Sequence, residues 1–210
     1  MKAIIFDLDG VIIHTDKYHY QAWKKLADRL GVYFDEEINN RLRGVSRMES
    51  LDIVLENSDY SSANSEMKNE MAEEKNNTYR ELLEKMTPED LEAEVLDTLT
   101  ALKQQGILMS IGSSSKNARL ILNKIGLGDF FDAISDGNNI TNSKPDPEVF
   151  LKAADYLNVN ACDCVVVEDA DAGISAAHRA EMKAIAMGDA VKYGNGDWNI
   201  GAFREILDII

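Results

Sequence analysis

The amino-acid sequence predicts an α/β protein: a doubly wound parallel sheet with a small α-helical domain inserted after its first strand. Two observations lead to this prediction. Short apolar runs typical of buried strands alternate with helical patterns along the second half of the 210-residue chain, as they do in doubly wound sheets. Ahead of them lies a block of roughly seventy residues with only the 3.6-residue period of helices. We therefore expect a core domain of residues 1–14 and 88–210 and a helical cap domain of residues 15–87.

The first strand is predicted from the apolar run Ala3–Phe6, which is typical of a strand buried on both faces. Asp7 and Asp9 follow at once, and side chains two positions apart in an extended chain point the same way. We therefore expect the two carboxylates to converge at a strand end, where open α/β sheets bind ligands. Close carboxylates need a shared proton, a cation or a metal ion. The alternative is a solvated acidic turn, which the strongly apolar run disfavours.

The helical block is predicted from three amphipathic stretches. The first ends at Gly31, a helix stop, and the second begins at a capping box formed by Ser46 and Glu49. The third runs from about Ser65. The apolar face of the first stretch comprises Ala22, Trp23, Leu26, Ala27 and Leu30, and that of the third comprises Met67, Met71, Tyr79, Leu82, Leu83 and Met86.

The remaining core elements are predicted from the alternation of strands and helices. A new helix is expected from Thr87–Asp90, which combines a cap residue, a proline at the first helical position and an acidic first turn. Strands are expected over Ile107–Ile111, Ala133–Ser135, Cys164–Val167 and Ala184–Met187. Helices are expected over Val95–Gln105, around Leu120–Leu122 with Ser115 as the cap, from Pro147 to Leu157, and over Ile174–Ala180.

The composition restricts the classes of function. An apolar content of 45% with 28% charged residues is ordinary for a soluble folded protein. The net charge of −15 argues against nucleic acid and anionic membrane surfaces as partners. No apolar run approaches the roughly 20 residues of a membrane span, and the chain enters a strand directly rather than a signal peptide. Cys162 and Cys164 are interpreted as reduced thiols of a cytoplasmic protein.

Polar groups follow three later strands. Ser113–Asn117 offers hydroxyl and backbone N–H groups where an anion could bind, although such a turn is often only a helix cap. Lys144 precedes Pro145, which favours an extended backbone and would present the amine, although alone it would be an ordinary surface lysine. Glu168 and Asp169 end an apolar strand with the oxygen ligands that Mg²⁺ prefers.

These groups, in this chain order, resemble the four motifs of the haloacid dehalogenase superfamily. The first motif, Asp-x-Asp-Gly-Val/Thr, is present as Asp7–Val11. The resemblance implies the Rossmann-like core of that superfamily, a Mg²⁺ ion and phosphoryl transfer. Such transfer needs an in-line nucleophile, charge compensation and a proton donor for the leaving oxygen.

The chain also resembles the β-phosphoglucomutase family within this superfamily. The matching stretches are Thr15–Trp23, Leu42–Arg47, Lys75–Tyr79 and Ser113–Asn117. The resemblance implies interconversion of β-D-glucose 1-phosphate and glucose 6-phosphate through an aspartyl phosphate, with glucose 1,6-bisphosphate as intermediate and activator. The expected partners are small sugar phosphates, with no nucleic acid and no membrane, and the expected protein is a cytoplasmic monomer. Arg43, Ala170, Ala93–Glu94 and His14 depart from the family pattern but remove no catalytic group.

The resemblance assigns roles residue by residue. It implies catalytic roles for Asp7 as nucleophile, Asp9 as general acid and base, Ser113, Lys144, His19 and Thr15. It implies substrate contacts for Asp9, Gly44, Val45, Arg47, Lys75, Ser114, Ser115, Lys116 and Asn117. It implies Mg²⁺ ligation by Asp7, the Asp9 carbonyl, Glu168 and Asp169. Without the resemblance, His19 would be interpreted as a surface histidine, and Arg47 and Lys75 as solvated charges.

Two other functions remain open at this point. A sugar-phosphate phosphatase would use the same core with water as the acceptor of the phosphoryl group. A non-catalytic phospho-acceptor module would also use an acidic pocket and a lysine, but it would need no helical lid.

Overall fold

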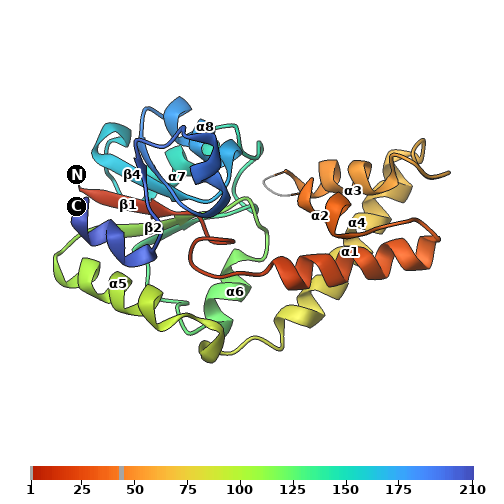
Figure 1. Cartoon of the computed structure of the whole chain (residues 1–210), viewed down its shortest axis with the longest axis horizontal. Coiled ribbons are helices and arrows are strands. Elements are labelled where there is room, and N and C mark those ends of the chain that lie inside the picture. The colour runs from red at the N-terminus through yellow and green to blue at the C-terminus, as the bar shows by residue number, and fades with distance from the viewer. Residues whose placement is uncertain (1, 43–44) are drawn as a thin grey trace. The chain divides into compact units, whose positions relative to one another are not determined.

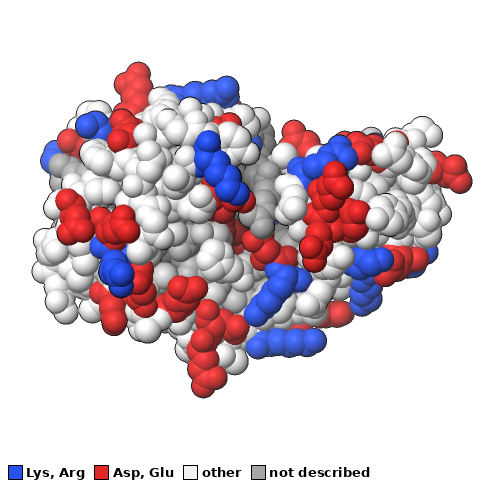
Figure 2. All heavy atoms as spheres, viewed as in Figure 1, with Lys and Arg blue, Asp and Glu red and all other residues white. Residues whose placement is uncertain are grey.

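The computed structural model describes residues 2–42 and 45–210, and it divides into two compact units (Figure 1). The core unit comprises residues 1–14 and 86–210, and the helical unit comprises residues 15–85. Acidic side chains occur on both units in Figure 2, in keeping with the net charge of −15. Within the described ranges, no helix combines the length and the apolar character that crossing a bilayer requires.

A parallel sheet organises the core unit. Over the described residues its strand order is β3-β2-β1-β4-β5-β6. The strands are β1 (Ala3–Phe6), β2 (Leu108–Gly112), β3 (Ala133–Ser135), β4 (Cys164–Glu168), β5 (Lys183–Ala186) and β6 (Trp198–Asn199). The order reverses between β1 and β4, which is the switch point where doubly wound sheets bind ligands. The α/β fold class predicted from the sequence is confirmed, whereas the two-residue strand β6 was not predicted.

Helices cover both faces of this sheet. Figure 1 shows α5 (Ala93–Gln104) and α6 (Ala118–Lys124) on one face, with α7 (Glu148–Tyr156) and α8 (Asp171–Arg179) on the other. Short 3₁₀ helices span Pro88–Asp90, Ala161–Asp163, Gly188–Tyr193 and Phe203–Asp208. All four residues of β1 are buried, as predicted. Ile5 packs in one apolar cluster with Phe150 of α7, whereas the Phe6 ring lies 5.7 Å from that of Phe203.

The helical unit contains α1 (Asp16–Leu30), α2 (Glu36–Asn40), α3 (Arg47–Leu55) and α4 (Ser65–Leu83). Gly31 ends α1 in the left-handed conformation, with φ of 69°. The capping box at the start of α3 is present, because Glu49 accepts from the Ser46 N–H at 2.9 Å and donates its own N–H to the Ser46 hydroxyl at 3.3 Å. The unit has its own apolar core, formed by Trp23, Leu26, Ala27, Phe34, Leu51, Val54, Leu55, Met71 and Ala72.

Three local predictions are corrected by the structure. The helix expected from Thr87 is a single 3₁₀ turn, because the Asp90 carboxylate accepts the Thr87 N–H at 2.9 Å and the chain becomes extended at Leu91. Ser115 does not cap α6, which begins at Ala118; its hydroxyl accepts the Asn117 N–H ahead of the helix. Met67 was expected on the apolar face of α4 but is 41% exposed.

Candidate active site

Three carboxylates gather at the carboxyl ends of β1 and β4. The parallel register pairs Phe6 with Val167, so the residues that follow each strand come together. Asp7 and Glu168 are buried, Asp169 is half-buried, and one ligand oxygen from each of the three lies within 4.8 Å of the other two. The pairing of β1 with β4 therefore builds a cluster of oxygen ligands from residues far apart in the sequence.

The turn after Asp7 requires glycine at position 10. Gly10 has φ of +94°, and a Cβ there would lie 2.1 Å from Asp169 Oδ2. The Gly10 N–H donates to the Ile13 carbonyl at 2.8 Å, which closes the turn. The Asp9 carboxylate is not one of the three clustered carboxylates, but its charge acts on Asp7.

Lys144 is buried within the carboxylate cluster. Its Nζ donates to Asp7 Oδ1 and, at 2.7 Å, to Glu168 Oε1. Burial by itself lowers the pKa of Lys144, but Asp7 and Glu168 outweigh it and raise the pKa above the usual value, so the amine stays charged. Phe150 covers the ammonium, with its ring centroid 4.7 Å from Nζ.

The same environment raises the pKa of Asp7 to about 7. Burial is the largest cause; Lys144 opposes it, and the neighbouring charges of Glu168 and Asp9 add to it. Three carboxylates facing one ammonium leave an excess of negative charge in a buried site. A divalent cation would relieve this excess, and carboxylate oxygens suit Mg²⁺. The donor set therefore fits the metal that the sequence motifs imply.

The segment Ser113–Asn117, here called the anion loop, follows β2 at the same edge of the sheet. Ser113 Oγ accepts the Ser115 N–H at 3.1 Å, and Ser115 Oγ accepts the Asn117 N–H at 3.2 Å. Each of these hydroxyls thus keeps its own hydrogen for donation. Ser114 Oγ is buried and has no hydrogen-bond partner among the described residues. The Lys116 side chain is exposed. These groups are the donors that an anion such as phosphate requires.

A second polar cluster lies inside the helical unit. Lys75 is 4% exposed, and its Nζ lies 2.9 Å from His19 Nδ1 and 4.8 Å and 4.7 Å from the ring centroids of Trp23 and Tyr79. An ammonium can only donate, so His19 Nδ1 accepts and the ring hydrogen resides on Nε2. Burial lowers the pKa of His19 well below its ordinary value of 6.5, and the charges of Lys75 and Arg47 add to the effect.

Arg47 and Thr15 are tied to α4 within the same unit. Arg47 Nη2 donates to Asn76 Oδ1 at 2.9 Å, and the Tyr79 hydroxyl donates to Thr15 Oγ1 at 3.1 Å. Val45 is 37% exposed. Gly44, a predicted substrate contact, and Arg43 lie outside the described residues.

Sequence reasoning missed Asn76 and the burial of Lys75. The signal was present, because the buried face of α4 runs at helical spacing through Met71, Ala72, Lys75, Asn76, Tyr79 and Leu83.

Comparisons with known proteins agree with this geometry. The family model for haloacid dehalogenase-like hydrolases matches residues 4–187. A β-phosphoglucomutase of Bacillus subtilis is 44% identical over 192 residues, which cover 90% of this chain and 84% of the relative. A phosphatase of phosphorylated carbohydrates from Thermotoga maritima is 31% identical over 187 residues, covering 88% of this chain and 84% of the relative.

Among solved structures, the crystal structure of a β-phosphoglucomutase from Clostridium difficile matches with a TM-score of 0.91 and 40% identity, covering 98% of this chain and 93% of the other. The fold, the strand-end carboxylates with their lysine, and the family match over most of the sequence agree. The chain belongs to the haloacid dehalogenase-like hydrolase family and is an enzyme of that superfamily.

Proposed function

We propose that this protein is a Mg²⁺-dependent β-phosphoglucomutase that interconverts β-D-glucose 1-phosphate and glucose 6-phosphate through glucose 1,6-bisphosphate. The observation that carries the proposal is the cluster of buried Asp7, Lys144 and Glu168 with half-buried Asp169 beside β1 and β4. Similarity to β-phosphoglucomutases at 44% and 40% identity supports the mutase over other reactions of the superfamily.

In the proposed reaction Asp7 is the nucleophile. One of its carboxylate oxygens attacks phosphorus, and the bond between phosphorus and the sugar oxygen breaks as the aspartyl phosphate forms. Asp9 donates a proton to the leaving sugar oxygen. In the second half-reaction Asp9 accepts the proton of the other sugar hydroxyl, whose oxygen attacks the phosphoryl group and releases Asp7.

Charge compensation comes from the groups around Asp7. Lys144 and Ser113 would hold the oxygens of the transferring phosphoryl group. The side chains of Asp7, Glu168 and Asp169, with the Asp9 carbonyl, would hold Mg²⁺. When bound, this ion supplies positive charge that offsets the carboxylates and the phosphoryl oxygens.

Substrate binding would use the anion loop and residues of the helical unit. The phosphate group that is not transferred would be bound by Arg47, Ser115, Lys116 and Asn117, and Ser114 would be a further substrate contact. Gly44 and Val45 would lie near the sugar ring. His19, Lys75 and Thr15 would couple the state of the helical unit to the acid–base role of Asp9.

The test is incubation with β-D-glucose 1-phosphate, Mg²⁺ and a catalytic amount of glucose 1,6-bisphosphate. The proposal expects glucose 6-phosphate with little free phosphate. Release of phosphate without glucose 6-phosphate would instead support a sugar-phosphate phosphatase. This activity is the second candidate, because a phosphatase of phosphorylated carbohydrates is 31% identical to this chain. A long-lived phosphoprotein with no turnover of any sugar phosphate would support a phospho-acceptor module and overturn both enzymatic functions.

A further inference from the structure

The segment Ser135–Asn138, here called the supporting loop, continues from β3 and packs against the backbone of the anion loop. Its three hydrogen bonds to the anion loop follow one another in order. The Ser113 N–H donates to the Ser135 carbonyl at 3.0 Å, and the Gly137 N–H donates to the Ser115 carbonyl at 3.1 Å. The Asn138 side-chain amide then donates to the Lys116 carbonyl at 3.0 Å. The supporting loop thus holds the anion loop along most of its length.

Gly137 is the point of closest approach between the two loops. It is buried, and a Cβ at this position would lie 2.4 Å from the Ser114 carbonyl oxygen and 2.9 Å from the Lys116 nitrogen. Both are backbone atoms, so no side-chain rotation relieves the clash. Any residue other than glycine must therefore change the spacing between the backbones of the two loops.

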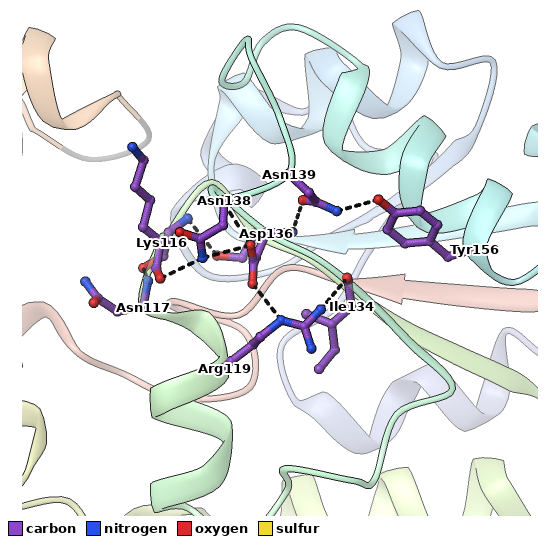
Figure 3. Close-up of polar contacts among 10 residues, drawn as sticks. Lys116, Asn117, Arg119, Ile134, Asp136, Asn138, Asn139 and Tyr156 are labelled. Carbon is purple, nitrogen blue, oxygen red and sulfur yellow. Dashed lines mark hydrogen bonds and ion pairs between the residues drawn. The ribbon is translucent and has the colours of Figure 1, made fainter.

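Asp136 holds the supporting loop in place through contacts with Asn138 and Arg119. It is 2% exposed, and its Oδ1 accepts the Asn138 backbone N–H at 2.8 Å. Its Oδ2 forms an ion pair of 3.2 Å with Arg119 Nε on α6, the helix that directly follows the anion loop (Figure 3). On the other side, Asn139 donates to the Tyr156 hydroxyl at 2.8 Å and so links the segment to α7. The network therefore connects α6 and α7 to the anion loop and the supporting loop.

The supporting loop contacts the backbone of the anion loop rather than its side chains. In Figure 3 the side chains of Lys116 and Asn117 point away from the Asp136 carboxylate. The bond from Asn138 engages the Lys116 carbonyl rather than its amine. The positions of these donors are thus set by residues that do not themselves face the anion.

We propose that the supporting loop, with Gly137 at its centre, is a positioning element that sets the affinity of the anion loop for the phosphate group that is not transferred. This inference rests on the proposed function for the identity of the substrate. Donors that are displaced by a fraction of an ångström form weaker hydrogen bonds to a bound phosphate. The nucleophile Asp7 and its partner Lys144 belong to other strand ends, and Gly137 closes on Ser114 and Lys116 rather than on Ser113. The phosphoryl-transfer step should therefore depend on Gly137 less than phosphate binding does.

The experiment compares Gly137→Ala with Gly201→Ala. Gly201 is a matched control, because a Cβ there would approach no closer than 3.6 Å, to a flexible Glu205 oxygen. Calorimetric titration without Mg²⁺ measures the Kd for glucose 6-phosphate and for inorganic phosphate. In parallel, acetyl phosphate with Mg²⁺ transfers its phosphoryl group to Asp7 and releases acetate, which intact-mass measurement follows.

We expect Gly137→Ala to raise both Kd values by about tenfold, as expected for weakening one or two hydrogen bonds to a charged group. Phosphorylation of Asp7 by acetyl phosphate should slow less than binding weakens, because this small donor has no second phosphate and would contact only Ser113 at the start of the loop. Gly201→Ala should match the parent protein in both measurements. A Gly137→Ala protein that binds phosphate like the parent, or that loses phosphorylation as strongly as binding, overturns the inference.

Asn138→Ala is the second variant if Gly137→Ala fails to fold. It removes the exposed amide that donates to the Lys116 carbonyl and, at 3.1 Å, to Asp136 Oδ1, and we expect Kd to rise about threefold while Tm changes little. No change in Kd for Asn138→Ala then overturns the inference. A parent protein that binds inorganic phosphate but not glucose 6-phosphate counts against the proposed function alone, since the loop is still tested with phosphate. A parent protein that binds neither overturns the positioning role as well.

Discussion

Burial acts in opposite directions on the two ionisable clusters, one in each unit. In the core unit, burial and then the charges of Glu168 and Asp9 raise the pKa of Asp7 to about 7, although Lys144 opposes them. In the helical unit, burial and then the charges of Lys75 and Arg47 lower the pKa of His19 well below 6.5. Both shifts favour the neutral form, because burial penalises whichever form is charged. The difference lies in the excess charge, which is negative only beside Asp7, where a metal ion can cancel it.

The comparison also concerns two buried lysines. Lys144 contacts the carboxylates of Asp7 and Glu168, whereas the contacts described for Lys75 include a histidine nitrogen and two aromatic rings. An ammonium among carboxylates is part of a reactive site. An ammonium beside a neutral imidazole fixes the tautomer and the charge of that imidazole.

Replacing the central carboxylate should remove activity. Asp7→Asn keeps the shape of the side chain but removes the nucleophile, so we expect turnover of β-D-glucose 1-phosphate to fall about a thousandfold or more. The coupled production of glucose 6-phosphate measures it, and intact mass should show no phosphorylated enzyme. Asp129→Asn, at an exposed aspartate of the core unit, is the control. Near-normal turnover of Asp7→Asn would refute the mechanism.

Removing the lysine of the core cluster should destabilise the protein. Lys144→Met leaves the carboxylates of Asp7 and Glu168 without their ammonium, and breaking such a buried pair costs about 3 kcal/mol. Because Mg²⁺ would restore positive charge, the ion should raise the Tm of the variant more than that of the parent. Calorimetry with and without Mg²⁺ measures both effects. Lys2→Met, at an exposed ion pair, should leave Tm unchanged; an equally unchanged Lys144→Met would contradict the prediction.

Lowering the pH should weaken the helical unit. The folded pKa of His19 is depressed, so as pH falls below 6.5 the unfolded chain binds a proton that the folded chain does not. Stability should therefore fall as pH falls through this range, by at most about 1.4 kcal/mol per pH unit. Denaturant unfolding followed by Trp23 fluorescence in a Trp198→Phe background measures it. His19→Gln should flatten the dependence of the unfolding free energy on pH, whereas His178→Gln, in the core unit, should not. An unchanged pH dependence in His19→Gln would mean that another group causes it.

Removing one hydroxyl from the helical cluster should have the smallest effect. Tyr79→Phe keeps the ring beside Lys75 and His19 but loses the bond to Thr15 Oγ1, which should cost about 1 kcal/mol. The same fluorescence titration measures it. Tyr33→Phe is the control, because the Tyr33 side chain is exposed and its hydroxyl bonds Asp35. If Tyr79→Phe lost no more unfolding free energy than Tyr33→Phe, the buried Tyr79 hydroxyl would add nothing to stability.

Much of the core unit was predictable because its signals are local. Apolar runs ending in acids marked β1 and β4, and pairing those ends in a parallel sheet brings their carboxylates together. What local pattern could not give is the approach of Lys144, whose loop carries no periodic signal. The contact between Gly137 and the anion loop is likewise a property of two loops in space, and glycine is common in turns for its backbone freedom alone.

The helical unit was predictable in outline but not in its polar interior. Capping at Ser46 and Gly31 followed from residue chemistry, and the structure has both. By its type alone Lys75 would be solvent-facing, whereas Lys75 and Asn76 both lie on the buried face of α4. Periodicity identifies such positions only when polar residues are counted with apolar ones. The role of Lys75 in substrate binding was predicted from the family resemblance and not from the composition.

The central position of β1 has a consequence for the order in which this chain folds. β1 is made first, but its neighbours β2 and β4 begin only at Leu108 and Cys164. The helical unit is continuous in sequence, so it can complete its local contacts while β1 still waits for partners. During synthesis the apolar segment Ala3–Phe6 is therefore an unpaired strand. Lys2 and Asp7 flank it with charges, which hinder pairing between nascent chains until the sheet closes around it.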